Sequence, residues 1–338
     1  MTVAIIGAGQ FGVALAHELA YSGQKTVLYV RDRASLMLWS ADGKFTGLYD
    51  ELALPRLLTL TDDLSEAVQK ADVIFNVVPC ASNRAVSIKI APLLKDHQKL
   101  VLCSKGFAND KGELLTDLWK RAGVKESQLL SLSGPGFAKE IVSGEPTCVS
   151  LACTQKENLL SVGALFAGRK FRLYYTTDII GVQVAGAMKN VFAILAGIVK
   201  GLGYGDNTSA ALLTMGLREM GALAQALGGD KKTLLGFSGV GDLLLTATSL
   251  QSRNTQFGVA LAKFGDKTKA VEAVGATIEG IATVERSLKL AESLDLSLPL
   301  VEGVHSVVKG YIKAEDLIDI LFDQVREFED YDDKNFST

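Results

Sequence analysis

A stretch of 21 residues, 179–199, is almost entirely apolar and does most to limit how this chain can fold. It is long enough to cross a bilayer as a helix. However, Gln183, Lys189 and Asn190 interrupt it, and a lysine at the centre of a membrane helix costs about 2.5–3.5 kcal/mol on insertion scales. We therefore expect no membrane span and predict a helix buried in the core of a globular domain.

Lys189 lies at the middle of that predicted helix, although lysine is rarely buried without a partner. Removing an ammonium from water is costly unless a partner compensates or its pKa shifts. Its helical neighbours one turn away are Ala185, Gly186 and Ala193, which leave open space beside the amine. The pattern predicts a ligand next to Lys189. The alternative is a lysine whose stem follows apolar surface while its amine reaches solvent.

The composition is that of a globular protein with ordinary cores. A length of 338 residues suggests two domains, and hydrophobic residues make up 48% of them. The net charge of −3 argues against a nucleic-acid partner, which would require a basic face. The four cysteines and three histidines show no metal-binding spacing, so we predict no metal. Free thiols and the lack of an apparent signal peptide predict a cytoplasmic protein.

Strand and helix signals alternate in the first half of the chain and then give way to helices. Alternation of this kind is typical of a doubly wound α/β sheet with parallel strands. We predict such a domain over residues 1–178 and an all-helical domain over 179–338. Residues 236–242 are expected to form a flexible turn, and the acidic run at 327–333 is expected to be solvated. Strands are predicted at 3–6, 26–30, 72–78, 100–104, 129–133, 146–152 and 171–175.

A GxGxxG sequence, Gly7 to Gly12, stands between the first predicted strand and the first predicted helix. In this context Gly7 permits a tight turn, Gly9 lets the backbone approach a pyrophosphate, and Gly12 lets helix and strand pack closely. The motif predicts a Rossmann domain that binds NAD or NADP. The choice between the two stays open, because Asp32 suits a ribose hydroxyl whereas Arg31 and its neighbour Arg33 suit a 2′-phosphate.

Two lysines are predicted to face each other across one crevice. Gly7, Pro79, Lys105 and Gly134 each follow a predicted strand, and ligands bind at the carboxyl edge of such sheets. Lys105 from this edge and Lys189 from the helical half would then polarise a carbonyl and bind an anion. A solvated strand-end lysine remains the alternative for Lys105.

Two segments of the helical half add further candidates. Asp242 precedes an apolar run and is placed to adjust the proton balance of Lys189; its alternative role is to cap a helix. Ser252, Arg253 and Asn254 stand at a predicted helix start. An arginine there binds phosphate through two charge-assisted hydrogen bonds, although a surface helix cap explains the same string.

Taken together, these strings resemble the bacterial NAD(P)-dependent sn-glycerol-3-phosphate dehydrogenases. The resemblance runs from residue 3 to about 312 and rests on GAGQFGVALA, SKG, SGPGFAKEI, GVQVAGAMKNVFAI, GVGDLLLTATSLQSRNTQFG and IEG. It implies an N-terminal Rossmann domain, a helical substrate-binding domain and interconversion of dihydroxyacetone phosphate and sn-glycerol 3-phosphate for glycerophospholipid synthesis. We also expect a homodimer.

The resemblance further assigns roles to individual residues. Lys189 becomes the acid/base of the reaction. The residues implied to bind substrate are Lys105, Gly134, Gly136, Lys189, Asn190, Asp242, Ser252, Arg253 and Asn254. Those implied to bind the cofactor are Gly7, Gly9, Gln10, Phe11, Gly12, Arg31, Lys105, Ala138, Arg253 and Glu279. The chain departs from the family at Gly136, where serine or threonine is usual, and at Gln10, where serine is common.

The resulting hypothesis is hydride transfer to the C2 carbonyl of dihydroxyacetone phosphate, with Lys189 protonating the developing alkoxide. An apolar setting and nearby Lys105 would lower the pKa of Lys189, whereas Asp242 would raise it. Two alternatives remain: another Rossmann-plus-helical dehydrogenase of the ketopantoate or 3-hydroxyacid type, and a redox sensor that binds NAD(P) without turnover. The first gives Arg253 no phosphate to bind, and the second has no use for a buried lysine.

Overall fold

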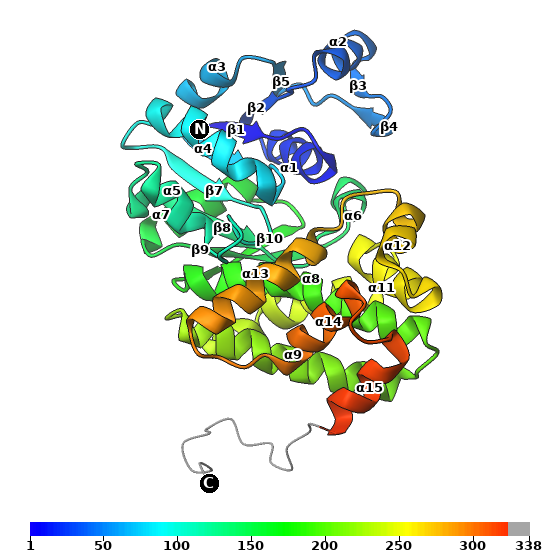
Figure 1. Ribbon diagram of the computed structural model, residues 1–338. Coiled ribbons are helices and arrows are strands. Elements are labelled where there is room, and N and C mark those ends of the chain that lie inside the picture. Colours follow the sequence, from blue (N-terminus) through cyan, green and yellow to red (C-terminus); the bar gives the residue numbers. More distant parts are fainter. Residues whose placement is uncertain (324–338) are drawn as a thin grey trace.

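The first half of the chain folds around an eight-stranded sheet in the computed structural model, which describes residues 1–323 (Figure 1). The acidic run at 327–333 lies outside the described residues. The spatial order of the strands is β10-β9-β8-β7-β6-β1-β2-β5. The strands are β1 (Thr2–Ile6), β2 (Lys25–Tyr29), β5 (Leu58–Thr61), β6 (Val73–Asn76), β7 (Lys99–Leu102), β8 (Leu129–Ser133), β9 (Thr147–Ala152) and β10 (Phe171–Thr176).

The sheet departs from the expected all-parallel arrangement at one pair of strands. β8 and β9 run antiparallel, with Leu132 opposite Leu151, while the other pairs are parallel. The connection between them holds only the short helix α6 (Ala138–Val142). Helix α6 packs against α1, and the chain re-enters the sheet beside β8 in the opposite direction.

Helices cover both faces of the sheet, as the predicted doubly wound fold requires. Along β1, Ile5 points into a core shared with α1 (Gln10–Tyr21) and α7 (Lys156–Gly163), whereas Ile6 points into a second core. That second core is covered by α3 (Leu64–Gln69), α4 (Asn83–Ile90) and α5 (Leu115–Arg121). Side chains alternate between the two cores because successive strand residues face opposite sides.

An excursion between β2 and β5 carries elements that the sequence patterns did not predict. Helix α2 (Arg33–Asp42) is followed by a separate two-stranded hairpin, β3 (Lys44–Phe45) and β4 (Tyr49–Ala53). The hairpin projects beside α2 at the edge of the molecule (Figure 1). Trp39 packs edge-on against Phe45 and fixes the helix to the hairpin.

The second half is helical, and no strand follows Thr176 within residues 1–323. β10 ends at Thr176 and the long central helix α8 (Ile179–Gly201) begins three residues later. The helices around it are α9 (Asp206–Ala226), α10 (Asp242–Thr248), α11 (Arg253–Phe264), α12 (Lys267–Val274), α13 (Glu279–Ser293), α14 (Pro299–Lys309) and α15 (Ala314–Asp323).

Helix α8 is the core of this half and is covered by other helices. Every residue from Gly181 to Val199 is buried, with α9, α10, α11 and α13 packed against it. It is the single described helix long and apolar enough to cross a membrane, and 89% of its most apolar window lies inside the protein. The prediction of a buried core helix is confirmed, and Lys189 lies at its middle.

Candidate functional site

The glycine-rich loop joins β1 to α1 in the geometry that a dinucleotide requires. Gly7 has a φ of +119°, and a Cβ there would lie 2.7 Å from the carbonyl oxygen of Val77. A Cβ on Gly12 would collide with the carbonyl oxygen of Gly7. Gly9 precedes α1 without a side-chain cap and has open space around it. Unpaired N–H groups at the start of α1 therefore face a space that an anion can enter.

A cavity of about 1050 Å³ extends from this loop to the helical half of the chain. Its size and its closely approaching backbone fit a nicotinamide dinucleotide. The predicted site residues that line it are Gly7, Gly9, Gln10, Phe11, Gly12, Arg31, Lys105, Gly136, Ala138, Lys189, Asn190, Arg253 and Glu279. The remaining four, Gly134, Asp242, Ser252 and Asn254, are not among the lining residues, although all but Ser252 are hydrogen-bonded to residues that are.

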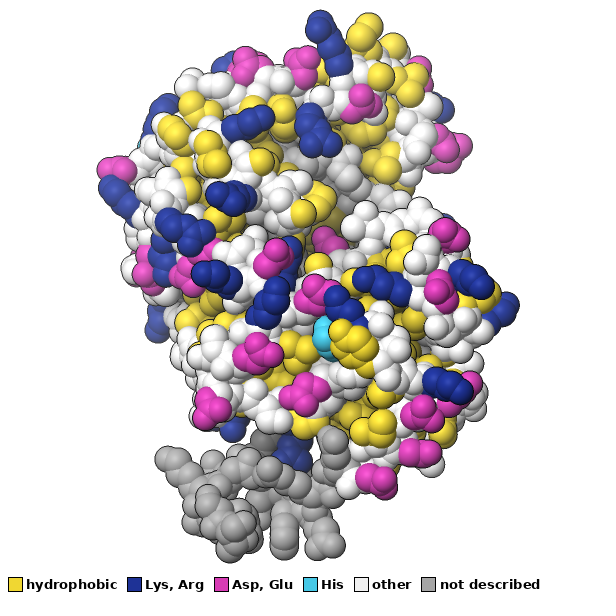
Figure 2. All heavy atoms as spheres, viewed as in Figure 1, with side chains coloured by type: hydrophobic (Ala, Val, Ile, Leu, Met, Phe, Trp, Pro, Cys, Tyr) yellow, Lys and Arg dark blue, Asp and Glu magenta, His cyan; other side chains and the backbone are white. Residues whose placement is uncertain are grey.

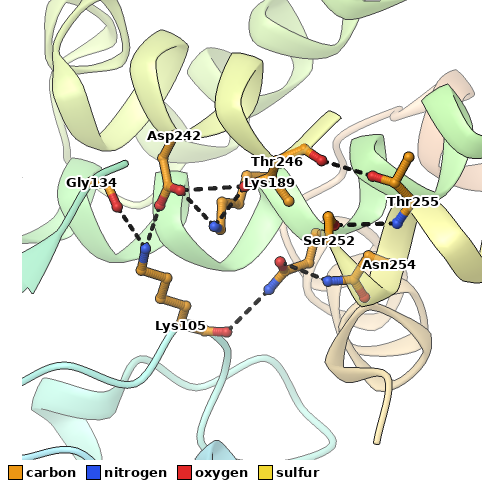
Figure 3. Close-up of polar contacts among 9 residues, drawn as sticks. Lys105, Gly134, Lys189, Asp242, Thr246, Ser252, Asn254 and Thr255 are labelled. Carbon is orange, nitrogen blue, oxygen red and sulfur yellow. Dashed lines mark hydrogen bonds and ion pairs between the residues drawn. The ribbon is translucent and has the colours of Figure 1, made fainter. Parts of the chain in front are cut away.

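The two lysines meet on one carboxylate, as Figure 3 shows. Lys189 Nζ donates to Asp242 Oδ1 at 2.6 Å and to Thr246 Oγ1 at 2.8 Å. Lys105 Nζ donates to Asp242 Oδ2 at 2.6 Å and to the carbonyl oxygen of Gly134 at 2.7 Å. The Asp242 side chain is 1% exposed and that of Lys189 is 9% exposed. The predicted convergence of Lys105 and Lys189 from the two halves is present.

Burial dominates the acid–base behaviour of Lys189. Desolvation lowers its pKa to about 8, and the nearby Lys105 cation acts in the same direction, while Asp242 opposes both. The amine therefore exchanges a proton near neutral pH, which suits a group that acts as both acid and base.

Two features of this cluster differ from the sequence interpretation. Residues 236–242 do not form a flexible turn, because Phe237–Gly241 forms a π turn that runs directly into α10. Asp242 is consequently the first residue of α10 rather than its cap. Thr246 was missed, although it follows Asp242 by four residues, which places both side chains on one face of the helix.

Ser252, Arg253 and Asn254 have three different roles in the structure. Ser252 caps α11 by accepting from the backbone N–H of Thr255 at 3.2 Å, so the capping alternative is present. Arg253 is exposed at the cavity edge, with Nη1 3.5 Å from the carbonyl oxygen of Thr277. Its guanidinium therefore keeps donors available for an anion.

Asn254 is buried and engaged within the protein. It donates to Asn190 Oδ1 at 3.0 Å and accepts from the backbone N–H of Gly280 at 3.0 Å. Asn190 Nδ2 in turn lies 3.4 Å from the carbonyl oxygen of Lys105. The two amides thus connect the start of α11 to the Lys105 loop.

The loop after β8 contributes through its backbone. Gly134 has a φ of +150°, and a Cβ there would lie 2.8 Å from the Cα of Val149, so a side chain is excluded. Gly136 differs, because a Cβ would make ordinary contacts of 3.4–3.8 Å with Ile141, Thr147 and Phe11. The fold therefore does not require glycine at position 136, and its lack of a side chain leaves this part of the cavity open.

The end of the cavity near Asp32 holds both the acidic and the basic side chains that NAD and NADP, respectively, would require. Asp32 Oδ2 accepts from Ser35 N at 3.0 Å and from Ser35 Oγ at 2.5 Å, and so caps α2. Hydrogen bonds from Ser35 lower the pKa of Asp32. Arg31 lines the same wall and is exposed, whereas Arg33 lies 3.9 Å from Asp62.

Glu279 lines the same cavity as the two lysines and is the first residue of α13. Burial raises the pKa of its carboxyl, while Arg253, Lys189 and Lys105 act to lower it. The backbone of Cys80 in the loop after β6 has a smaller effect in the same direction.

The face of the protein that Figure 2 shows has mixed charge. Figure 2 shows positive and negative side chains interspersed over the face viewed, without an extended basic area. The four cysteines are unpaired. Among residues 1–323, no group of three or more His, Cys, Asp or Glu side chains is arranged to hold a metal ion.

Two family models cover nearly all of the described chain. Residues 2–159 match the N-terminal part of the NAD-dependent glycerol-3-phosphate dehydrogenases, and residues 178–319 match their C-terminal part. The chain is 38% identical over 323 residues to a glycerol-3-phosphate dehydrogenase [NAD(P)+] of Rhizobium etli, covering 94% of this chain and 96% of that protein. It is also 38% identical to the enzyme of that name from Aeromonas hydrophila, covering 91% and 92%.

A solved structure agrees with these relatives. The crystal structure of glycerol-3-phosphate dehydrogenase from Coxiella burnetii superposes with a TM-score of 0.88 at 33% identity. The superposition covers 96% of this chain and 99% of that one.

Proposed function

The chain belongs to the NAD-dependent glycerol-3-phosphate dehydrogenase family, and from that premise we propose how its residues carry out the reaction. It is an NAD(P)-dependent oxidoreductase that interconverts dihydroxyacetone phosphate and sn-glycerol 3-phosphate. The observation that carries the assignment of roles is the buried Lys189–Asp242–Lys105 cluster, which opens onto the dinucleotide cavity.

Lys189 is the acid/base. When bound, NAD(P)H supplies the hydride to the C2 carbonyl of the substrate. Lys189 gives its proton to the oxygen that becomes an alkoxide, and in the reverse direction it takes the proton of the secondary alcohol. Asp242 and Thr246 orient the amine through bonds of 2.6 and 2.8 Å. A correctly placed proton donor contributes about 10²–10⁴-fold to the rate.

Lys105 supplies a second positive charge from the sheet side. Held between Asp242 and the Gly134 carbonyl, it stabilises negative charge on the substrate oxygen. A fixed cation in a site that excludes water stabilises such charge more than solvent does. It also keeps the pKa of Lys189 low.

Arg253 anchors the phosphate of the substrate. It stands at the first position of α11, where backbone N–H groups and the helix dipole add to its own charge. Asn254, whose amide already donates to Asn190, has a second N–H for a phosphate oxygen. Binding energy from this remote group orients the carbonyl that reacts. Asn190 and the Gly136 backbone contact the substrate from the cavity wall, and Ser252 and the Gly134 backbone are the remaining proposed substrate contacts.

The cofactor residues are assigned from the cavity wall. The backbone of Gly7–Gly12 holds the pyrophosphate, with Gln10 and Phe11 at the start of α1. Arg31 holds the adenosine end, and Ala138, Arg253 and Glu279 border the cavity farther along.

Wider assignments belong to the same proposal. The cofactor-binding domain spans residues 1–178 and the substrate-binding domain spans 179–338. The protein acts in the cytoplasm as a homodimer and supplies glycerol phosphate for glycerophospholipid synthesis.

The decisive experiment follows oxidation of NADH and of NADPH at 340 nm, with dihydroxyacetone phosphate, dihydroxyacetone and ketopantoate as separate substrates. The proposal expects turnover with dihydroxyacetone phosphate and little with the other two. Preference for ketopantoate would support the alternative dehydrogenase, and cofactor binding without turnover would support the sensor.

A further inference from the structure

A buried polar network lies behind the cavity wall, on the sheet face covered by α4 and α5. Its centre is Asn83, at the start of α4, which is 0% exposed. Asn76, the last residue of β6, and Trp119 of α5 are equally buried. Polar groups at such depth destabilise a fold unless they are hydrogen-bonded, and apolar residues would fill this space without that requirement.

Asn83 uses both ends of its amide in this network. Its Oδ1 accepts from Asn76 Nδ2 at 2.7 Å and from Trp119 Nε1 at 3.3 Å. Its Nδ2 donates to Ser104 Oγ at 3.0 Å and lies 3.4 Å from the carbonyl oxygens of both Pro79 and Cys80. Ser104 Oγ then donates to the carbonyl oxygen of Val78 at 2.6 Å.

These bonds connect the two loops that form the wall opposite the helical half. The loop after β6 carries Val78, Pro79 and Cys80, whose carbonyl oxygens face Asn83 and Ser104. The loop after β7 carries Ser104 and, next to it, Lys105. Val78, Pro79, Ser104 and Lys105 line the cavity, whereas Asn83 does not. Asn83 therefore acts on the site only through the loops that it holds.

The network leaves one buried polar atom without a hydrogen bond, and packing alone does not explain why. Asn76 Oδ1 is buried without a hydrogen-bond partner. An unpaired buried acceptor is destabilising, so a network that retains one is better explained by what it holds in place.

We propose that Asn83 is a positioning residue that fixes the loop carrying Lys105 against the loop after β6. The inference rests on the role proposed above for Lys105. Asn83 touches neither substrate nor cofactor, and its effect is transmitted through the hydroxyl of Ser104 and the carbonyls of residues 78–80. When these bonds are lost, Lys105 Nζ is no longer held at its distance from Asp242 and Lys189.

The test compares Asn83→Leu with a matched variant at the opposite end of β7, the strand that leads to Ser104 and Lys105. Gln98 is 1% exposed and donates to the carbonyls of Val68 and Ala71, just before β7 begins. Gln98→Leu therefore removes a buried amide of similar connectivity but at the edge far from the cavity. Both variants are expected to lower the melting temperature.

Three readouts separate positioning from a structural role. Asn83→Leu should lower kcat/KM for dihydroxyacetone phosphate by about 10²-fold, the scale of a 1 Å misplacement, whereas Gln98→Leu should leave it near wild type. Amide hydrogen exchange of residues 103–106 should accelerate only in Asn83→Leu. The basic limb of the pH profile of the reduction should move to higher pH. Lys105, Asp242 and Glu279 are the charged groups around Lys189, and of these only Lys105 lies on the loop that Asn83 holds. When this cation moves away, the pKa of Lys189 rises.

Equal kinetic losses in both variants, or unchanged exchange at 103–106 in Asn83→Leu, would overturn the proposal. If Asn83→Leu does not fold, the double variant Asn76→Leu/Asn83→Leu replaces two partners by apolar groups and relieves the unpaired amide. The same readouts then apply to it. Failure of this inference is distinct from failure of the proposed function, because Lys189→Met tests the latter without altering the network.

Discussion

Lys189 on α8 and Asp242 on α10 form a buried ion pair, with Nζ 2.6 Å from Oδ1. The pair does not hold the amine at its ordinary acidity, because burial outweighs the attraction and leaves its pKa near 8. The other carboxylate oxygen of Asp242 is bonded to Lys105, so one anion is shared between two cations. The sharing of one carboxylate between two amines therefore determines the acid–base behaviour of the site.

Replacing the amine should abolish proton transfer while sparing cofactor binding. Lys189→Met keeps the length and apolar character of the stem, so α8 should still pack. We expect kcat to fall by about 10²–10⁴-fold, with the affinity for NADH, measured by its fluorescence, changed little. Retention of turnover by this variant would contradict the assignment of Lys189 as the acid/base.

The rate should depend on pH in opposite ways in the two directions. Reduction requires protonated Lys189, so its kcat/KM should decline above pH 8, where the amine loses its proton. Oxidation requires the neutral amine, so its rate should rise through the same pH. Initial rates over pH 6–10 in both directions check this, and parallel profiles would contradict it.

Removing the shared carboxylate should make Lys189 more acidic still. In Asp242→Asn the charge that raises the pKa of Lys189 is lost, while burial and Lys105 continue to lower it. The decline of the reductive rate should therefore begin at a lower pH than in the wild type. Breaking a buried pair of this kind also costs about 3–5 kcal/mol of stability, which urea unfolding at neutral pH would measure.

Lys105→Met should shift the pKa of Lys189 in the opposite direction and therefore serves as the control for Asp242→Asn. It removes a cation that lowers the pKa of Lys189 and leaves Asp242 in place. The reductive limb should then move to higher pH. Shifts in the same direction for both variants would show that the cluster is not coupled as the geometry indicates.

Loss of the phosphate anchor should affect binding more than chemistry. Arg253→Ala removes charge-assisted hydrogen bonds worth about 1.5–3 kcal/mol, so KM for dihydroxyacetone phosphate should rise roughly 10- to 10²-fold, while unphosphorylated dihydroxyacetone should be affected little. Lys263→Ala removes a cation near the far end of the same helix, α11, and should leave KM unchanged. A similar effect of Arg253→Ala on both substrates would argue against the anchor.

Replacing Gly136 by serine should add a contact between the protein and the substrate. Gly136→Ser should fold normally, because its Cβ meets only ordinary contacts. A hydroxyl that reaches the substrate should lower KM for dihydroxyacetone phosphate by about two- to tenfold, the worth of one neutral hydrogen bond. Gly136→Ala supplies the Cβ without the hydroxyl and separates the two effects; equal KM values for these variants would exclude a hydroxyl contact.

The sequence was most informative where local chemistry and periodicity coincide. The Gly7–Gly12 turn, the buried helix around Lys189 and the meeting of Lys189 with Lys105 all followed from motif, spacing and strand order. Their positions depend on short-range backbone rules, which a single sequence carries.

Features that depend on tertiary geometry were not predictable. The antiparallel β8–β9 pairing depends on how the connection that contains α6 packs. The hairpin after α2 has only a weak strand pattern in its sequence. Thr246 was within reach of helical spacing once Asp242 was placed on a helix. Asn83 had no such signal, because an asparagine at a helix start usually suggests a cap rather than the centre of a buried network.

The π turn at Phe237–Gly241 makes the site sensitive to chain length as well as to residue identity. Such a turn holds one residue more than an α-turn, and each residue turns a helix by about 100°. Deleting Val240 would tighten the backbone to an α-turn and swing the Asp242 carboxylate away from both amines, with every charged residue still present in the sequence. A segment that resembles an ordinary glycine-rich connection is thus one in which the loss of a single residue would act on both lysines as the loss of their carboxylate does.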